Sequence, residues 1–263
     1  CAMLAAAMPC PRRQFLTLVT IPALGGAVPG AVATLRMVSE TLPPYVLPED
    51  HPLGEGIDVD IARQALGAQG GLPIRLERLP WRRALALLES GEADLAPGVR
   101  RTVERERFLA FSQPYGSVVR HRAYSAREVR FSVRRSADLA QWHVGLVQGY
   151  AYPENLLAAL GARVSRLPDE PALLRVAAAG RVDVALVTDL RARWAVQQLG
   201  LQQALRLHPF EFAEGHRTQM AFSRKSGPAM AALALMNRGL AQLERGGWQR
   251  FEQPYLQPLP AQA

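Results

Sequence analysis

One pattern occurs twice in this chain: a helical stripe of apolar residues ends at glycine, and an aspartate and a short buried strand follow. The first copy, at 88–95, reads LESGEADL, and the second, at 178–184, reads AAGRVDV. Glycine after a helical stripe is typical of a C-terminal cap, and a helix that leads into a strand beside it is the unit of α/β folds. Two separate copies favour two α/β lobes over one long sheet.

Other segments have the periodicity of strands or helices. Two adjacent prolines at 43–44 exclude a helix or a central strand there and predict a rigid turn that carries Tyr45. The remaining elements are listed by type. Strands are expected at 35–39, 74–79, 94–96, 143–147 and 182–187, and helices at 57–66, 81–90, 173–179 and 228–245.

The lobes are expected to be joined by two crossings, in the extended stretches 117–125 and 218–223. The chain would then form the first part of lobe 1 over 34–121 and lobe 2 over 122–221, and return to lobe 1 over 222–263. Paired crossings of this kind let two rigid bodies rock about a cleft.

The basic composition raises the question of nucleic-acid binding, since the net charge is +8 and the pI is about 10.3. The basic residues are almost all arginine, with Lys225 the sole lysine, and acids are scattered among them. No basic run alternates with aromatic residues as a nucleic-acid surface would require. No window approaches the roughly 18 unbroken apolar residues of a membrane span. We expect a globular protein with a solvated arginine-rich surface and no nucleic-acid partner.

The first 33 residues have the features of a twin-arginine-like export signal. Arg12 and Arg13 precede a mildly apolar stretch at 17–30, and the small-x-small residues of a signal-peptidase site follow, ending at Ala33. We expect export to the periplasm and removal of the leader near Ala33. The general secretory route is an alternative, as is a disordered leader ahead of a true start at Met8.

Cysteine and histidine usage argues against most catalytic chemistry. Cys1 and Cys10 both lie in the leader, so the exported chain would have no disulfide, thiol nucleophile or thiolate metal site. The five histidines share no metal-like spacing, and no Ser–His–Asp grouping stands out. We therefore expect a protein that is not an enzyme, with no catalytic residue, no metal and no cofactor.

Several short motifs occur in one order along the chain. They are PPY at 43–45, GIDVDI at 56–61, Trp81 with LLESGEAD at 87–94, TVER at 102–105, FSQPY at 111–115, VGLVQG at 144–149 and GGW at 246–248. Together they resemble bacterial solute-binding family 3, the amino-acid-type periplasmic binding proteins of ABC transporters. Each motif is weak alone, but their joint order and spacing are specific, and they cover about 35–255.

The resemblance implies a two-lobe periplasmic-binding-protein fold of type II, with a ligand cleft between lobes that two hinge crossings join. It also implies a function: capture of a small carboxylate-bearing ligand, an amino acid or a related organic acid, for an inner-membrane ABC permease. We expect such a protein to be a monomer.

The resemblance places the family's carboxylate-binding arginine at Arg105, six residues before Phe111. Thr102 suits a helix N-cap, which would put Arg105 in the first turn beside free backbone N–H groups. A guanidinium binds a carboxylate through two parallel charge-assisted hydrogen bonds. The alternative is a surface arginine that pairs with Glu104 or Glu106.

Lobe 1 is expected to supply further ligand residues. Trp81 would form the pocket floor, unless it is ordinary helix core, and Tyr45 or Leu42 would cap the pocket from the proline turn. Arg100, just after Gly98, falls where the family has a small hydroxyl residue. It either points to solvent or adds a positive charge to the pocket, which would favour an acidic or dicarboxylate ligand.

In lobe 2 the resemblance implies that Gln148, Gly149 and Tyr150 form the loop that also holds the carboxylate. Relatives have hydroxyl residues after the glycine, so only backbone donors are expected here. The family aspartate that binds an α-ammonium group corresponds to Thr188, and a shift of one residue would bring Asp189 to that place. Without either contact an ammonium group would be buried without a counter-charge, so the ligand need not be an α-amino acid.

Two alternatives from other classes stay open. One is a periplasmic sensory or receptor partner of a membrane signalling protein; since the chain ends at Ala263 without a membrane helix, sensing would require a separate partner. The other is an enzyme similar to cyclohexadienyl dehydratase, whose glutamate follows a Gly-Thr loop. Here Tyr150, Ala151 and Tyr152 occupy that stretch, and Glu154 comes later.

Overall fold

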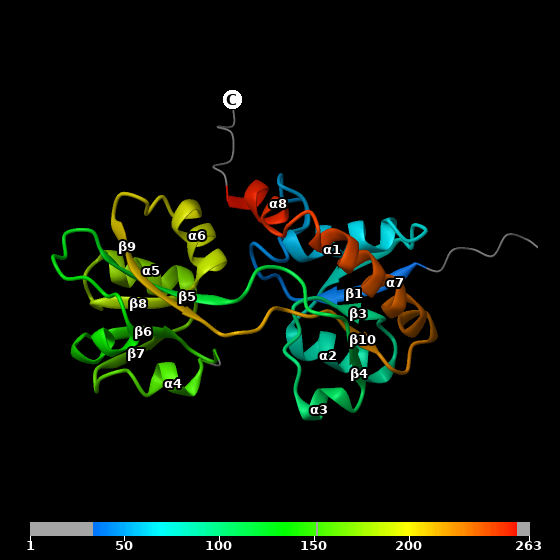
Figure 1. Cartoon of the computed structure of the whole chain (residues 1–263), viewed down its shortest axis with the longest axis horizontal. Coiled ribbons are helices and arrows are strands. Elements are labelled where there is room, and N and C mark those ends of the chain that lie inside the picture. Colours follow the sequence, from blue (N-terminus) through cyan, green and yellow to red (C-terminus); the bar gives the residue numbers. More distant parts are fainter. Residues whose placement is uncertain (1–33, 151, 257–263) are drawn as a thin grey trace, which may run out of the picture. The chain divides into compact units, whose positions relative to one another are not determined.

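The computed structural model describes residues 34–150 and 152–256 (Figure 1). The expected export signal and both cysteines therefore lie outside the described residues, as does Ala151 of the lobe 2 loop. None of the helices within these two ranges is long and apolar enough to cross a membrane.

Two five-stranded sheets organise the described chain, which confirms the predicted α/β class (Figure 1). The sheet of lobe 1 has the order β2-β1-β3-β10-β4. Its strands are β1 (Leu35–Ser39), β2 (Ile74–Arg78), β3 (Leu95–Ala96), β4 (Leu109–Phe111) and β10 (Ala221–Ser223). The sheet of lobe 2 has the order β7-β6-β8-β5-β9. Its strands are β5 (Arg120–Ala126), β6 (Val144–Val147), β7 (Val164–Leu167), β8 (Val184–Thr188) and β9 (Leu205–Ala213).

Helices pack against both sheets. Those of lobe 1 are α1 (Ile57–Gly67), α2 (Trp81–Ser90), α3 (Val103–Glu106), α7 (Gly227–Glu244), α8 (Gln249–Glu252) and the short 3-10 turn η2 (Gln253–Leu256). Those of lobe 2 are η1 (Ser136–Gln141), α4 (Glu154–Leu157), α5 (Glu170–Ala178) and α6 (Asp189–Gln198). Every strand and helix predicted from periodicity has a counterpart here, so their existence and type are confirmed.

The core of lobe 1 has two layers because successive strand residues point to opposite faces of the sheet. Met37 of β1 packs with Met236 and Leu240 of α7, and α7 lies beside α1 (Figure 1). Val38, the next residue of β1, packs on the other face with Leu88 of α2. The left-handed conformation of Gly91, with a φ of 89°, ends α2 as predicted.

Lobe 2 repeats this arrangement. Val147 of β6 packs with Leu173 of α5, and the neighbouring Leu146 packs on the opposite face with Leu156 of α4 and Leu139 of η1. The strands β6, β7 and β8 run parallel, and β5 is antiparallel to β8 and β9. The carboxyl ends of β6 and β8 therefore meet at one edge of the sheet.

Two segments connect the sheets: the first crossing, 112–119, and the second crossing, 214–220. They hydrogen-bond to each other, with the Tyr115 N–H donating to the Thr218 carbonyl at 2.9 Å and the Val119 N–H to the His216 carbonyl at 3.2 Å. The expected lobe boundaries, after 121 and after 221, fall inside β5 and β10. Extended crossings and the strands that continue them share one sequence periodicity, so the pattern does not separate them.

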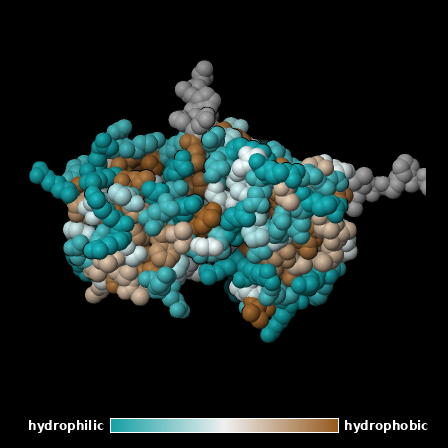
Figure 2. All heavy atoms as spheres, viewed as in Figure 1, coloured by the Kyte–Doolittle hydropathy of each residue, from teal (hydrophilic) through white to brown (hydrophobic). Residues whose placement is uncertain are grey.

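The surface is mixed rather than uniformly basic. Hydrophilic residues spread over the face seen in Figure 2, and hydrophobic residues form separate patches among them. Many arginines pair with acids from other elements, such as Arg36 with Glu77 at 2.7 Å and Arg63 with Glu55 at 2.6 Å. Part of the positive charge of the arginines is therefore balanced by acids in surface ion pairs.

Candidate functional site

A cavity of about 810 Å³ is lined by residues of both lobes and of the second crossing. Its lobe 1 residues come from the turn after β1 and the loop after β3. Its lobe 2 residues come from the start of β5, the ends of β6 and β8, and the first turns of α5 and α6. Carboxyl ends of parallel strands are the usual ligand edge of α/β sheets, and the volume suits a small molecule.

The loop after β3 is fixed from behind by a buried tyrosine. The backbone N–H of Gly98 donates to the Tyr115 hydroxyl at 3.1 Å, and this hydroxyl also bonds to the Asp58 side chain. Gly98 has a φ of 63°, and a Cβ there would lie 3.2 Å from Asp58 Oδ2. Glycine is therefore needed both for the left-handed backbone and for the close approach of Asp58.

Asp58 is a buried carboxyl group directly behind this loop, with 4% of its surface exposed. Burial raises its pKa to about 7, although the hydrogen bond from Tyr115 acts to lower it. The residue comes from the first turn of α1, where the GIDVDI motif places it. It does not line the cavity, so its contribution to the site is to support the Gly98 loop through Tyr115.

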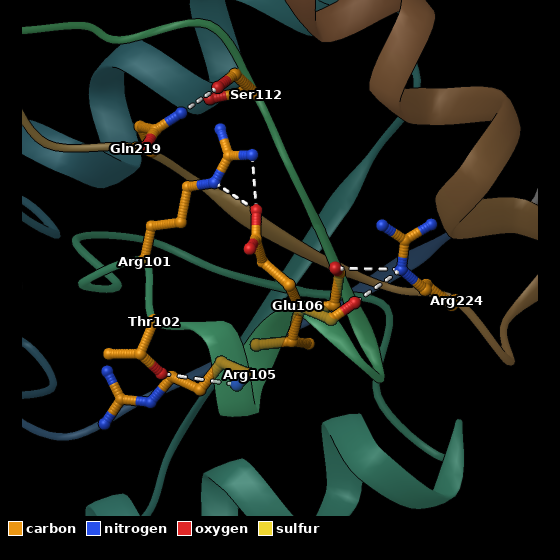
Figure 3. A network of polar contacts seen from close by, with 8 residues as sticks. Arg101, Thr102, Arg105, Glu106, Ser112, Gln219 and Arg224 are labelled. Atoms are coloured by element: carbon orange, nitrogen blue, oxygen red, sulfur yellow. Dashed lines mark hydrogen bonds and ion pairs between the residues drawn. The ribbon is translucent and has the colours of Figure 1, made fainter.

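Arg105 is held by three neighbours. Thr102 caps α3 and accepts a hydrogen bond from the Arg105 backbone N–H at 3.3 Å (Figure 3). The guanidinium donates from Nη1 to the Arg100 carbonyl at 2.8 Å, and its central carbon lies 5.4 Å from the centroid of the Trp81 ring. Glu106 pairs with Arg101 instead of Arg105 (Figure 3).

The structure brings together half of the ten residues predicted for the site. The five that line the cavity are Gly98, Arg100, Gly149, Tyr150 and Thr188. Leu42, the alternative cap, also lines it.

The other five predicted residues lie elsewhere. Tyr45 and Asp189 line a separate cavity of about 190 Å³, and Arg105, Trp81 and Gln148 line neither cavity. Arg105 is nonetheless one hydrogen bond away from the cavity wall, because its partner Arg100 lines the cavity.

Charged residues line the cavity in equal numbers of each sign. The arginines are Arg100, Arg101, Arg191 and Arg217, and the acids are Glu40, Asp169, Glu170 and Glu214. Arg100 lines the cavity and is exposed to solvent, and its positive charge acts to lower the pKa of Glu214. Because the cavity has as many acids as arginines, the charge of Arg100 does not by itself favour a dicarboxylate.

Asp189, which follows Thr188 at the end of β8, does not line the cavity in place of the family's aspartate. The Thr188 hydroxyl is buried and has no hydrogen-bond partner within residues 34–150 and 152–256. Asp189 points instead toward Arg122, with 3.9 Å between Arg122 Nη1 and Asp189 Oδ1. A shift of one residue therefore does not place the Asp189 carboxylate in this cavity.

Sequence reasoning missed a buried ion pair beside Thr188. Arg191 Nη2 lies 2.7 Å from Glu170 Oε2, and the Glu170 side chain is 1% exposed. The Arg191 guanidinium carbon lies 5.2 Å from the centroid of the Tyr150 ring. These residues belong to α5, α6 and the loop after β6, so no local motif links them.

A second missed pair joins β5 to the second crossing. His121 Nε2 lies 2.6 Å from Glu214 Oε1, and His216 Nε2 lies 3.3 Å from Glu214 Oε2. Burial acts to raise the pKa of Glu214, but the hydrogen bond to His121 and the charges of His121, His216 and Arg100 lower it overall. No group of three or more potential ligand side chains in the described part of the chain has a geometry that would hold a metal ion.

Comparison with known proteins identifies a family over nearly all of the described chain. Residues 35–258 match the bacterial extracellular solute-binding proteins, family 3. No curated protein matches the chain.

Solved structures show the same fold. The second substrate-binding domain of a putative amino acid ABC transporter from Streptococcus pneumoniae Canada MDR_19A is 19% identical, with a TM-score of 0.68 over 86% of this chain and 100% of that one. Substrate-binding domain 2 of Lactococcus lactis GlnP, in an open conformation, is 20% identical, with a TM-score of 0.68 over 89% of this chain and 99% of that one.

A structure from another functional class is also similar. A histidine kinase sensor domain that resembles periplasmic binding proteins is 22% identical, with a TM-score of 0.63 over 86% of this chain and 98% of that one. The expected type II periplasmic-binding-protein fold is therefore confirmed, and the same fold serves both transport and sensing.

Proposed function

Because this chain belongs to family 3 of the bacterial extracellular solute-binding proteins, we propose that it is an exported binding protein for a small carboxylate-bearing ligand. It would deliver that ligand, as a monomer, to an inner-membrane ABC permease. The family's extracellular location and the leader-like composition of 1–33 both support export to the periplasm.

The observation that carries the proposal is the way Arg105 is held behind the cavity wall. A guanidinium has five N–H donors, and the carbonyl of the cavity-lining Arg100 receives one of them at 2.8 Å. The Trp81 ring restricts the guanidinium on one side. A receptor whose side chain is already fixed loses less conformational entropy when it binds, and a carboxylate at the Gly98 loop would add charge-assisted hydrogen bonds to the same guanidinium.

The two crossings support closure around the ligand. They are hydrogen-bonded to each other, and the second crossing contributes Glu214, His216, Arg217, Thr218 and Gln219 to the cavity. In the proposed cycle the ligand docks on lobe 1 through Arg105, and lobe 2 then closes through the loop that contains Gln148, Gly149 and Tyr150. The ligand favours the closed form only by the difference in its affinity for the two forms.

The test is ligand binding by an Arg105→Ala variant. A thermal-shift screen of amino acids, dicarboxylates and aromatic acids identifies a ligand, and calorimetry gives its affinity. We expect Arg105→Ala to lower affinity roughly 100-fold, because hydrogen bonds to charged groups are worth about 1.5–3 kcal/mol each. The matched control is Arg107→Ala, which removes an exposed arginine from the end of the same short helix.

Unchanged affinity in Arg105→Ala, with an unchanged circular dichroism spectrum, would remove Arg105 as the carboxylate anchor. If Arg107→Ala weakened binding equally, the effect would be one of net charge near the cavity rather than of a specific contact.

Sensing is the second candidate, because the fold is also that of a histidine kinase sensor domain. Deletion of the gene distinguishes the two roles. Transport predicts loss of ligand uptake, whereas sensing predicts normal uptake and loss of the transcriptional response to the ligand.

A dehydratase-like activity is not part of the proposal. Glu154, the first glutamate after the loop that follows β6 along the chain, is exposed and does not line the cavity. We expect no turnover of prephenate or arogenate by the purified protein, and product formation in that assay would replace the binding role with an enzymatic one.

A further inference from the structure

Trp194 is a lobe 2 residue whose side chain packs in the core of lobe 1. It belongs to α6, where Ala192 and Ala195 are three residues apart, share one helix face and pack in a core cluster of lobe 2. Trp194 is 7% exposed and belongs instead to the core cluster of lobe 1. Within the two described ranges it is the only lobe 2 residue in that cluster. Helix α6 therefore contributes to both cores.

The lobe 1 side of this contact is firmly held. The centroids of the Trp194 and His51 rings are 5.6 Å apart. Helix α6 also lies beside η2, where Tyr255 is 2% exposed and donates a hydrogen bond to the Asp60 carboxylate of α1 at 2.5 Å. Pro43 of the proline turn lines a cavity of about 130 Å³ together with Trp194. The lobes therefore touch at a second place, in addition to the two crossings.

This contact restricts how the lobes can move. Two crossings alone would let the lobes rock about a cleft. A buried tryptophan covers about 150–250 Å² of surface, and protein interiors are too densely packed for such a ring to slide freely. A rotation of lobe 2 against lobe 1 therefore has to shift Trp194 within its packing or withdraw it.

The arrangement that Trp194 stabilises is one with a wide cavity. Cavities of about 300–1,000 Å³ enclose drug-sized ligands, so the 810 Å³ cavity is larger than a small carboxylate fills. Enclosing such a ligand requires the walls from the two lobes to approach each other.

The two crossings indicate what that approach does to α6. The second crossing lines the 810 Å³ cavity, and the first crossing lines the cavity of about 190 Å³, where α6 faces α8. Since the crossings are hydrogen-bonded side by side, these two cavities flank the hinge. A rotation that narrows the larger cavity then draws α6 away from α8 and from the core of lobe 1.

We propose that Trp194 sets the ligand affinity of this protein from outside the binding cavity, by holding the lobes in the arrangement with the wide cavity. The inference rests on the proposed function, in which lobe 2 closes over a ligand held on lobe 1. Apparent affinity falls with the fraction of molecules that can adopt the binding form, and the Trp194 contact lowers that fraction. Trp194 does not line the 810 Å³ cavity, so it acts only through the movement of the lobes.

Trp194→Ala tests the proposal by calorimetry. The probe is the amino acid, dicarboxylate or aromatic acid that gives the largest thermal shift with the wild type. We expect the variant to bind this probe at least threefold more tightly, and to unfold at a lower urea concentration because a buried aromatic side chain is lost. Tighter binding by a less stable protein is not what general loss of structure produces. Unchanged or weaker affinity in the folded variant overturns the proposal.

His51→Ala is a milder second variant, since it removes the ring on the lobe 1 side and leaves α6 intact. It should tighten binding in the same direction by a smaller factor. In the double variant with Trp194→Ala the gain should be smaller than the product of the two single gains, because both changes remove one contact. Two independent gains would overturn the pairing of these rings.

The matched control is Trp142→Leu, which removes an aromatic contact inside lobe 2, where Trp142 stacks on Phe131. It should lower stability and leave affinity for the probe unchanged. If it tightened binding as much as Trp194→Ala, the gain would come from destabilisation of lobe 2, and the proposal would be wrong.

Small-angle X-ray scattering gives a readout that needs no ligand. Trp194→Ala alone should have a smaller radius of gyration than the wild type alone, close to that of the wild type saturated with the probe. Identical profiles of variant and wild type overturn the proposal. This result stands even if Arg105→Ala shows that the carboxylate anchor is wrong. Loss of binding in Arg105→Ala, with Trp194→Ala identical to the wild type, keeps the proposed function and removes only this inference.

Discussion

The guanidinium carbon of Arg105, in α3, lies 5.4 Å from the centroid of the Trp81 ring, at the start of α2. Trp81 does not line the cavity, so its contribution to binding would be indirect. A cation over an aromatic face is worth about 0.5–2 kcal/mol, and the ring also restricts the guanidinium. We expect Trp81→Leu to weaken ligand binding about threefold to thirtyfold, measured by calorimetry.

The matched control is Trp142→Leu in lobe 2. Trp142 stacks on Phe131 with ring centroids 3.8 Å apart and belongs to a different core cluster. It should destabilise the protein without changing affinity for the ligand. Equal losses of affinity in both variants would mean that general destabilisation, and not the position of Arg105, explains the effect.

The parts of the fold and of the site that the sequence predicted are those with local signals. Thr102 caps α3 as expected because a hydroxyl before a helical turn can accept a backbone N–H within three residues. Gly91 ends α2 because glycine adopts the left-handed conformation without steric cost.

The parts that were missed depend on tertiary register. His121 faces Thr188 only because β5 pairs antiparallel with β8, and Glu170 meets Arg191 only because α5 and α6 pack together. β9 was also missed, since Pro209 interrupts its alternation. The strand tolerates proline because it lies at the edge of its sheet.

Helices α1 and α7 approach closely at a glycine. A Cβ on Gly239 of α7 would lie 2.1 Å from the Ala65 carbonyl oxygen of α1, which is backbone and cannot rotate away. We expect Gly239→Ala to lower the free energy of unfolding by about 1–3 kcal/mol, the usual cost of overpacking. Urea unfolding followed by circular dichroism measures the change.

Gly67→Ala is the matched control in the partner helix. A Cβ on Gly67 has no neighbour within 4 Å among the described atoms, and the residue ends α1. Alanine restricts the unfolded chain more than glycine does, so this variant should be neutral or more stable by up to about 1 kcal/mol. Comparable losses in both variants would contradict the close contact between the helices.

A buried histidine in lobe 2 makes the free energy of unfolding depend on pH. The Val133 N–H donates to His208 Nδ1 at 3.2 Å, so Nε2 carries the proton and donates to the Ser125 hydroxyl at 2.8 Å. Burial, with the charge of Arg206, lowers the pKa of His208 from 6.5 to about 4. Between these values the unfolded chain binds more protons than the folded one, so stability falls as the pH falls.

The expected loss from His208 between pH 6.5 and pH 4 is about 3 kcal/mol, from the free-energy equivalent of a pKa shift. His208→Gln removes the titrating group and should flatten the curve of unfolding free energy against pH in that window. Urea titrations at several pH values compare the variant with the wild type. Parallel curves for the two proteins would show that His208 is not the group responsible.

Asp58 in lobe 1 makes the free energy of unfolding depend on pH in the opposite direction. Burial raises the pKa of its carboxyl from 3.8 to about 7, so the folded chain binds more protons than the unfolded one between these values. The stability that the protonated carboxyl contributes is complete below pH 4 and is lost as the pH rises to about 7. The shift corresponds to about 4 kcal/mol.

Asp58→Asn imitates the protonated carboxyl and can still accept the hydrogen bond from Tyr115. We expect the variant to lack the decline between pH 4 and pH 7 and to be more stable than the wild type at pH 8, in urea unfolding followed by tryptophan fluorescence. Because Asp58 supports the Gly98 loop through Tyr115, ligand affinity should also change less with pH in the variant. A variant that is less stable than the wild type at pH 8 would instead indicate that the ionised carboxylate, held by the Tyr115 hydroxyl, is the form the fold requires.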